Sequence, residues 1–570
     1  MTLAAFLQHW SLSEHPFRGE EARQDPVFSR LALLPAPSPT DRPFGPVGLP
    51  RAGANVQHPD FEKIAGDFAL PSAAIVFGEK GSGKTAIRLQ LAEHIAAHNA
   101  APAHAGRRVL LVPFDHLNDI LDRFVARVRP SIRDKNATIV DVLKRFRLAD
   151  HVDGILARAV PRVVDAVLGD APARPASSSP GAVGATAPAP AGESASRVDI
   201  VRAGADGKPP PSADLKRFAR ALDLGTKHDL LQLQAVYDRP DDADDRTRRL
   251  RRRLGLRRSW IDRAESLWVA LGWLAPAAVL AQYIRDGHIR NGQPDLDPIW
   301  TTAFFTALAV WVLFLFKRAL SERLIIGRIA SRLRRQIRVI PRSERSYARS
   351  IRQLPRAARA AAALPLTDAE DQRYAMLDRL RRVLAAIGYS GVIVVVDRLD
   401  EPSAIAGDVE RMRAIAWPLL NNKFLQQEGL GIKLLLPAEL RHVLYRESAA
   451  FFQEARLDKQ CLVERLAWSG PMLYDLCTAR LNACRPAGAQ PISLSDLFAD
   501  DVTRGDIVDA LEQMHQPRDA FKLLYACIAE HCSNVTADQA AFKVGKPVLD
   551  MIRKQQTERV RQLYMGVRPA

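Results

Sequence analysis

Residues 78–85 read GEKGSGKT, and this short stretch decides the fold. Before it, residues 73–77 (AAIVF) form an apolar run that is typical of a buried strand, and after it residues 86–98 (AIRLQLAEHIAAH) have the pattern of a helix. Glycines let the backbone turn closely around an anion, and successive N–H groups at a helix N-terminus attract negative charge. The sequence therefore predicts a strand, a phosphate-binding loop and a helix, in that order.

The same stretch matches GxxxxGK[ST], the Walker A pattern of P-loop nucleotide-binding proteins. The lysine of this pattern reaches the β- and γ-phosphates, and the final hydroxyl is a ligand of Mg²⁺. We therefore expect ATP and Mg²⁺ as cofactors. The residues predicted to bind them are Gly78, Glu79, Lys80, Gly81, Ser82, Gly83, Lys84 and Thr85, with Thr85 on the metal.

A second motif follows more than 300 residues later, at residues 391–402 (GVIVVVDRLDEP). Its five consecutive β-branched residues predict a strand buried on both faces, as in a parallel sheet. Asp397 ends this strand, where a carboxylate can hold Mg²⁺, usually through water. Asp400 and Glu401 follow on the loop and are the nearby candidates to orient an attacking water. We interpret this segment as Walker B.

Two further predicted strands are residues 108–114 (RVLLVPF) and residues 431–440 (GIKLLLPAEL). Glu439 or Arg441, at the end of the latter, is a candidate sensor of the γ-phosphate. Arg518 lies in the first turn of a predicted C-terminal helix and is a candidate to reach the nucleotide from a lid. The predicted fold class is α/β, with a P-loop NTPase parallel sheet, flanking helices, a C-terminal helical lid and an inserted transmembrane hairpin.

The hairpin is predicted from two uncharged stretches, residues 267–284 (LWVALGWLAPAAVLAQYI) and 299–316 (IWTTAFFTALAVWVLFLF). Each helix would be roughly 27 Å long, close to the thickness of the hydrocarbon core of a bilayer. Both outer flanks are rich in arginine, whereas the connecting loop holds two Arg and three Asp. The positive-inside rule then places both flanks in the cytoplasm. A hairpin would also keep the two Walker motifs on one side of the membrane, as a shared sheet requires.

The chain would thus lie in the plasma (inner) membrane, with two spans and with both termini and the ATPase domain in the cytoplasm. Residues 171–212 are rich in Pro, Ala, Ser and Gly and predict a disordered linker. The predicted divisions are an irregular N-terminal region (1–70), the first half of the core (71–168), the linker (171–212), the insertion with basic helices and hairpin (213–366), the second half of the core (367–450) and the helical lid (451–570).

The formal charge of +17 and the pI of about 9.9 favour an anionic partner. Arginines beside a membrane are attracted to anionic lipid, so much of this charge has a membrane explanation. A tethered ATPase that handles nucleic acid is an alternative, because basic charge also fits phosphate binding. A scaffold that binds ATP without hydrolysing it is a third reading. A protein partner and a homo-oligomer are further expectations.

In its arrangement the chain resembles the KAP family of P-loop NTPases, related to the STAND and AAA+ groups, which carry transmembrane helices between Walker A and Walker B. The resemblance rests on GEKGSGKT, the hairpin and VVVDRLDEP, and covers roughly residues 55–110 and 260–445. The family's Walker B tends to end in DDLDR. Here Arg398 holds the second acidic position, and Glu401 holds the position where Arg is usual. The identity of the catalytic carboxylate therefore stays open. The resemblance implies a membrane-anchored ATPase used in signalling, scaffolding or phage exclusion.

Overall fold

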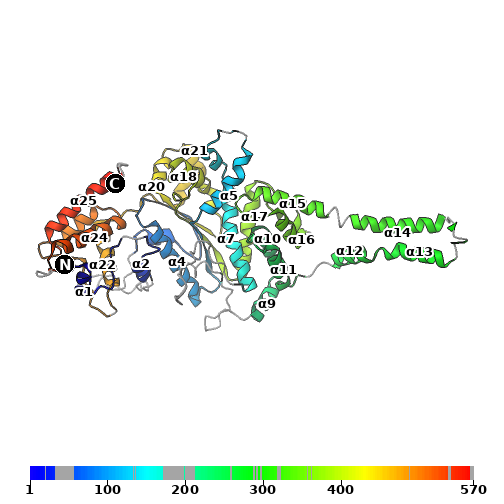
Figure 1. Ribbon diagram of the computed structural model, residues 1–570, viewed down its shortest axis with the longest axis horizontal. Helices are drawn as coiled ribbons and strands as arrows, with labels where there is room; N and C mark the ends of the chain where they lie inside the picture. The colour runs from blue at the N-terminus through cyan, green and yellow to red at the C-terminus, as the bar shows by residue number, and fades with distance from the viewer. Residues whose placement is uncertain are drawn as a thin grey trace.

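The computed structural model is an elongated molecule with a sheet in its central body (Figure 1). A helical layer that contains the first and the last helix, α1 (Leu3–His9) and α25 (Lys546–Tyr564), lies at one end, and a pair of long apolar helices projects from the other (Figure 1). The predicted linker, residues 171–212, lies outside the described residues except for Val198 and Ser212. The structure describes residues 1–18, 21–32, 57–132, 134, 136–170, 198, 212–256, 260–286, 289–290, 293–294, 298–316, 322–355, 357–360, 363–486, 488–536 and 541–564.

The central sheet has five strands, all parallel, in the order β2-β5-β6-β1-β7. The four predicted strands are present, and the short edge strand β7 was not predicted. The strands are β1 (Ala74–Gly78), β2 (Arg108–Phe114), β5 (Tyr389–Val396), β6 (Leu430–Pro437) and β7 (Cys461–Val463). Segments on both sides of the apolar hairpin therefore build one sheet. The predicted α/β class with a parallel sheet is confirmed.

Both faces of the sheet are covered, which explains why its strands are nearly continuous runs of Val, Ile and Leu. One face packs on α3 (Phe61–Ala65) and α4 (Lys84–Ala100). The other packs on α7 (Leu148–Leu168) and α17 (Glu370–Ala386), with α10 (Leu224–Tyr237) behind them. The alternation of side chains along each strand divides the apolar residues between these two cores.

Further helices of the body surround this framework. They are α5 (Asn118–Val128), α6 (Ile139–Leu143), α9 (Ser212–Ala221), α11 (Ala243–Arg253), α15 (Glu322–Gln336), α16 (Glu344–Arg352), α18 (Val409–Ala416), α19 (Asn422–Leu425), α20 (Ala438–Leu444) and α21 (Ala449–Ala455).

The directions of the connections between strands indicate where a ligand site is expected on this sheet. The chain leaves β1 toward β2 on one side, and leaves β6 toward β7 on the other. Since β1 and β6 are neighbours, they form a topological switch point. In open α/β sheets, ligands bind outside the carboxyl ends of the strands at such a point. The glycine-rich loop after β1 and Glu439 after β6 flank this position.

The N-terminal residues join the C-terminal helices in a core of their own. Residues 1–70 were predicted to be irregular, and this is wrong for the described part, which contains α1 (Leu3–His9), α2 (Pro26–Ala32) and α3. Buried Phe6, Phe17 and Val27 share one cluster with the C-terminal layer. That layer consists of α22 (Gly470–Ala483), α23 (Arg504–Glu512), α24 (Pro517–Asn534) and α25 (Lys546–Tyr564).

Two helices are long and apolar enough to cross a membrane, at Leu267–Arg285 and Pro298–Phe316. The first is interrupted, so that α12 (Trp260–Leu271) ends and α13 (Leu274–Arg285) begins within it. Pro276 accounts for the interruption because it has no N–H to donate to the preceding turn. The second is the continuous helix α14 (Pro298–Phe316), and the short antiparallel strands β3 (Ile289–Arg290) and β4 (Gln293–Pro294) join the two at the tip.

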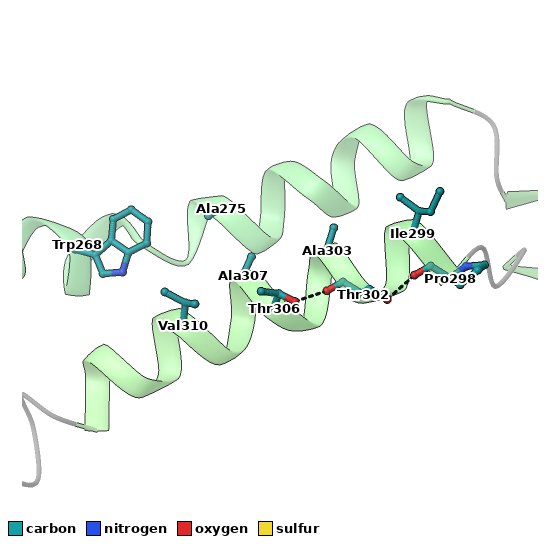
Figure 2. Close-up of a pocket in the computed structure, with 9 residues that line it drawn as sticks. All are labelled: Trp268, Ala275, Pro298, Ile299, Thr302, Ala303, Thr306, Ala307 and Val310. Carbon is teal, nitrogen blue, oxygen red and sulfur yellow. Dashed lines mark hydrogen bonds between the residues drawn. The ribbon is translucent and has the colours of Figure 1, made fainter.

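A shallow groove lies between these helices, lined by Trp268 and Ala275 on one side and by α14 on the other, from Pro298 to Val310 (Figure 2). The hydroxyls on α14 are satisfied within the helix: Thr306 donates to the Thr302 carbonyl at 2.7 Å, and Thr302 donates to the Pro298 carbonyl at 2.5 Å (Figure 2). Such internal bonds leave an apolar exterior, as a lipid environment requires.

The arginines that flank the hairpin differ in their surroundings. Arg246 on α11 is buried, with ion pairs to Asp165 (2.8 Å), Asp238 (2.9 Å) and Asp170 (3.1 Å). On the same helix, Arg251 donates to the Gln353 carbonyl at 2.7 Å. On α15, by contrast, Arg323, Arg328, Arg332 and Arg335 are exposed. The first flank thus combines arginines that bind groups of the protein with exposed ones such as Arg248, Arg249 and Arg252, and α15 adds exposed positive charge on the second flank.

Candidate functional site

The glycine-rich loop, residues 79–83, connects β1 to α4 at the switch point. Gly81 and Gly83 have φ values of 104° and 98°, which L side chains rarely adopt. A Cβ on Gly78 would lie 2.5 Å from the Ser82 hydroxyl oxygen, so a larger residue there would displace the Ser82 side chain. The Ser82 hydroxyl is buried and has no hydrogen-bond partner among the described residues. The loop therefore has the shape and the open donor of an anion cradle.

Lys84 begins α4 and folds back over this loop. Its Nζ donates to the carbonyls of Gly78 at 2.6 Å and Glu79 at 2.9 Å. Burial lowers the pKa of Lys84 below its ordinary value, against the opposing effects of Asp397, Asp400 and other carboxylates. The ammonium is thus held beside the loop by backbone carbonyls and surrounded by negative charge, within the cradle predicted to receive phosphate.

Thr85 and Asp397 meet although 312 positions separate them in the sequence. The Thr85 hydroxyl donates to Asp397 Oδ2 at 3.1 Å, and Asp397 directly follows β5. Its side chain is 1% exposed, and burial raises its pKa, with Arg88 and the Thr85 hydrogen bond opposing that shift. The two residues predicted to serve the same Mg²⁺ ion are therefore direct neighbours.

The two predicted catalytic carboxylates lie in different surroundings. Glu401 is exposed and forms an ion pair with Arg398 at 3.3 Å. Asp400 is half-buried and is among the carboxylates that favour the charged form of Lys84, as is Glu439 at the start of α20. The surroundings favour Asp400 over Glu401 as the residue closer to the cradle.

Arg398 adopts a φ of 59°, an uncommon conformation for a residue other than glycine. It follows Asp397 directly, and its backbone N–H donates to Asp397 Oδ1 at 2.9 Å. Its guanidinium pairs with Glu21 of the N-terminal segment as well as with Glu401. Arg398 thus turns away from a β conformation and binds carboxylates.

Arg518, the predicted lid residue, does lie against the loop. A Cβ placed on Gly81 would meet Arg518 Cβ at 3.1 Å and Gln516 Oε1 at 2.8 Å. Gln516 also donates to Glu79, so the start of α24 touches the glycine-rich loop at two points. Arg441, the other sensor candidate, instead donates to the Glu464 carbonyl at 3.3 Å.

Sequence reasoning missed three residues of this region. Trp468 donates its indole N–H to the Ser82 carbonyl at 2.8 Å and so anchors the loop to the segment before α22. Arg88 lies one turn after Thr85 on α4, with its Nε 3.2 Å from Asp397 Oδ2 and its Nη1 2.7 Å from Asp115 Oδ2. Asp115 directly follows β2, so the rule that singled out Asp397 at a strand end would also have found it.

The residues fit a bound Mg²⁺–nucleotide. Within the described parts of the chain, no group of three His, Cys, Asp or Glu side chains is arranged to hold a metal alone. Mg²⁺ commonly takes one or two protein ligands and completes its shell with phosphate and water. Thr85 and Asp397 beside an open cradle match that pattern. No protein-family model, curated protein or solved structure matches this chain.

Proposed function

We propose that this chain is a membrane-anchored P-loop ATPase that binds Mg²⁺–ATP and acts as a nucleotide-dependent switch in signalling or defence. The single observation that supports it best is the hydrogen bond between Thr85 and Asp397 at the carboxyl edge of a parallel sheet. These are the two side chains that the Walker A and Walker B patterns assign to one metal ion.

Each residue has a role in this proposal. The N–H groups of the glycine-rich loop and Lys84 bind the β- and γ-phosphates. Thr85 and Asp397 hold Mg²⁺, which neutralises charge on the phosphates when it is bound. Asp400 or Glu401 orients the attacking water. Arg518 and Gln516, which touch the loop at Gly81, would sense nucleotide and pass the change to the C-terminal layer as its lid.

The membrane is the proposed site of anchorage, and the two apolar helices are its proposed spans. In this arrangement both outer flanks and the ATPase body lie in the cytoplasm. The exposed arginines of α15 are the residues best suited to anionic headgroups. Neither apolar stretch contains an ionisable residue of the kind that marks a transport pathway, which favours anchorage over transport.

An ATP-binding scaffold remains the second candidate, supported by one feature. Arg398 binds both Glu21 and Glu401, so one of the two candidate catalytic carboxylates is already engaged. Steady-state turnover distinguishes this candidate from an ATPase, because a scaffold binds ATP with normal affinity and does not hydrolyse it.

The proposal is tested by the affinity of the purified full-length protein for a fluorescent ATP analogue in Mg²⁺. Lys84→Ala is expected to weaken binding about ten- to a hundredfold, since a hydrogen bond to a charged group contributes about 1.5–3 kcal/mol. Lys423→Ala is the matched control, because Lys423 is exposed and pairs with Asp371 on the surface. Unchanged affinity of the Lys84 variant would disprove the nucleotide site.

A further inference from the structure

The short segment Glu21–Asp25 connects three separate parts of the molecule through ion pairs. Glu21 pairs with Arg398, which follows β5. Arg23 pairs with Asp115, which follows β2, and its Nη1 lies 3.3 Å from His116 Nε2. Asp25 pairs with Arg480 of α22 at 2.7 Å. The segment therefore lies across the carboxyl edge of the sheet and is fixed to the C-terminal layer.

Arg23 is the outer end of a continuous line of charges that leads to the proposed metal site. Asp115 accepts from Arg23 and, on the same oxygen, from Arg88 at 2.7 Å. Arg88 in turn lies 3.2 Å from Asp397, which accepts from Thr85 at 3.1 Å. The side chains of Arg88, Asp115 and Asp397 are 9%, 7% and 1% exposed, so solvent does little to screen their interactions.

Arg88 is thus shared between two buried carboxylates, and Arg23 competes with it for one of them, Asp115. With Arg23 present, Asp115 has two cationic partners and Arg88 is free to orient Asp397. Without Arg23, Arg88 would be the remaining ion-pair partner of Asp115 among the described residues, and we expect it to be drawn away from Asp397. Residues that orient a metal ligand commonly change metal affinity by about 10–100-fold when they are removed.

The position of Arg23 is itself set by the C-terminal layer. Asp25 accepts the backbone N–H of Val27 at 3.0 Å and pairs with Arg480. Arg480 also donates to the Pro16 carbonyl at 2.9 Å. These contacts are buried, and they hold the segment to α22 on both sides of Arg23. A shift of the C-terminal layer relative to the sheet would therefore move the Arg23 guanidinium relative to Asp115.

We propose that Arg23 is a positioning residue for the Mg²⁺–nucleotide site, supplied by the N-terminal segment and acting through Asp115 and Arg88 on Asp397. This proposal rests on the proposed nucleotide-binding function and adds to it a structural link between the C-terminal layer and the metal ligand. The Arg23 guanidinium contacts Asp115 and His116, both of which follow β2, rather than the glycine-rich loop or Asp397. Its effect is therefore on the metal-dependent part of binding.

The test measures the affinity of the full-length protein for a fluorescent ATP analogue with Mg²⁺ and with EDTA. Arg23→Ala is expected to weaken Mg²⁺-dependent binding about tenfold and to leave metal-free binding unchanged. Arg23→Lys, which keeps the positive charge, is expected to restore most of the affinity. Arg30→Ala is the matched control, because Arg30 lies in the same N-terminal region and pairs with Glu14 away from the sheet.

Three outcomes would overturn the proposal: unchanged Mg²⁺-dependent binding in Arg23→Ala, an equal loss with and without metal, or an equal loss in Arg30→Ala. An equal loss in both variants would show that the N-terminal segment acts only on stability, which melting temperatures of the variants would record. Lys84→Ala is measured in parallel, so that a failure of the Arg23 proposal can be distinguished from a failure of the proposed nucleotide site. If that variant binds nucleotide normally, the nucleotide site itself is wrong.

Discussion

Trp311 of α14 donates its indole N–H to the backbone carbonyl of Val269, 3.2 Å away, at the turn before α12 ends. The ring also lies over Gly272, where an added Cβ would meet Trp311 Cδ1 at 2.6 Å. The interrupted helix and the continuous one thus fit together at this tryptophan, and a second aromatic pair, Trp268 with Phe314, also joins them. The Trp311 indole gives the Val269 carbonyl a hydrogen-bond partner, which a backbone group needs where water is absent.

Gly272→Val is therefore expected to separate α14 from the interruption and to destabilise the hairpin by about 1–3 kcal/mol, as overpacking does. Thermal denaturation in detergent, followed by tryptophan fluorescence, measures the change. Gly327→Ala on α15 serves as control because a Cβ there meets nothing within 4 Å. Equal melting temperatures for wild type and Gly272→Val would show that the contact is not formed.

The topology is tested by labelling with a membrane-impermeant maleimide in sealed cells and in inverted vesicles. In a cysteine-free background, Gln293→Cys at the tip of the hairpin is expected to react from outside the cell. Lys554→Cys, exposed on α25, is expected to react only in inverted vesicles. Reaction of both positions from the same side would contradict a membrane-spanning hairpin.

Arg246→Ala is expected to cost about 3–5 kcal/mol of stability, because it leaves buried carboxylates without their shared cation. Arg248→Ala on the same helix is the control. Arg248 is half-exposed and pairs with Asp245 on the surface, where an ion pair contributes about 0–1 kcal/mol. Melting temperatures of the two variants make the comparison. A similarly small change in melting temperature for both variants would mean that the ion pairs of Arg246 contribute little to stability.

Turnover separates the two candidate catalytic carboxylates. Asp400→Asn is expected to reduce steady-state ATP hydrolysis at least about a hundredfold, the usual contribution of a general base, because Asp400 is the candidate nearer to Lys84. Glu401→Gln is expected to have a much smaller effect, since Glu401 is engaged by Arg398. A larger loss in Glu401→Gln would reverse the assignment, and tight binding without any turnover in wild type would favour the scaffold.

Stability is expected to fall as the pH is lowered from about 6.5 to about 4, with His151 as one cause. Burial lowers the pKa of His151 to about 4 from an ordinary 6.5, with its hydrogen bond to the Ile415 carbonyl (2.8 Å) opposing the shift. Because the unfolded chain binds the proton first, the contribution is complete above pH 6.5 and is lost toward pH 4. The loss is on the order of 3 kcal/mol.

His151→Gln, which keeps an N–H donor, should flatten this dependence when melting temperatures are recorded from pH 4 to pH 7. His442→Gln on α20 controls for the loss of an exposed histidine. An unchanged slope in His151→Gln would assign the acid sensitivity to other groups.

The sequence predicted local features well and distant packing poorly. Runs such as residues 73–77 and 391–396 are long, apolar and β-branched, so the strands were found in place. The three residues of β7 are too few to show the alternation of side chains that predicts a strand. They form a strand because they pair with β1. The interruption at Gly272 was likewise hidden within a stretch of uniform hydropathy, although Pro276 was its visible cause.

The candidate site divides in the same way. Lys84, Thr85 and Asp397 belong to recognisable motifs and lie together in the structure, whereas Arg23 and Trp468 belong to none. Arg23 lies at the carboxyl edge of the sheet because the N-terminal helices pack with the C-terminal ones, a contact across almost the whole chain. Trp468 reaches the loop from the segment before α22 and belongs to the same cluster. Arginine is also so frequent in this sequence that no pattern singles out Arg23 or Arg88.

The strand order has a consequence for biosynthesis. β1 and β2 leave the ribosome first, but β6 and β5 lie between them in the finished sheet and are translated only after the hairpin. In the finished sheet, β1 and β2 are three strand spacings apart, roughly 14 Å. The two strands that belong between them are not yet translated when β1 and β2 emerge, so the early half of the domain cannot complete the sheet. Under the proposed function, the hairpin would reach the membrane before the nucleotide site exists, so a newly made chain would be anchored first and would become able to bind nucleotide afterwards.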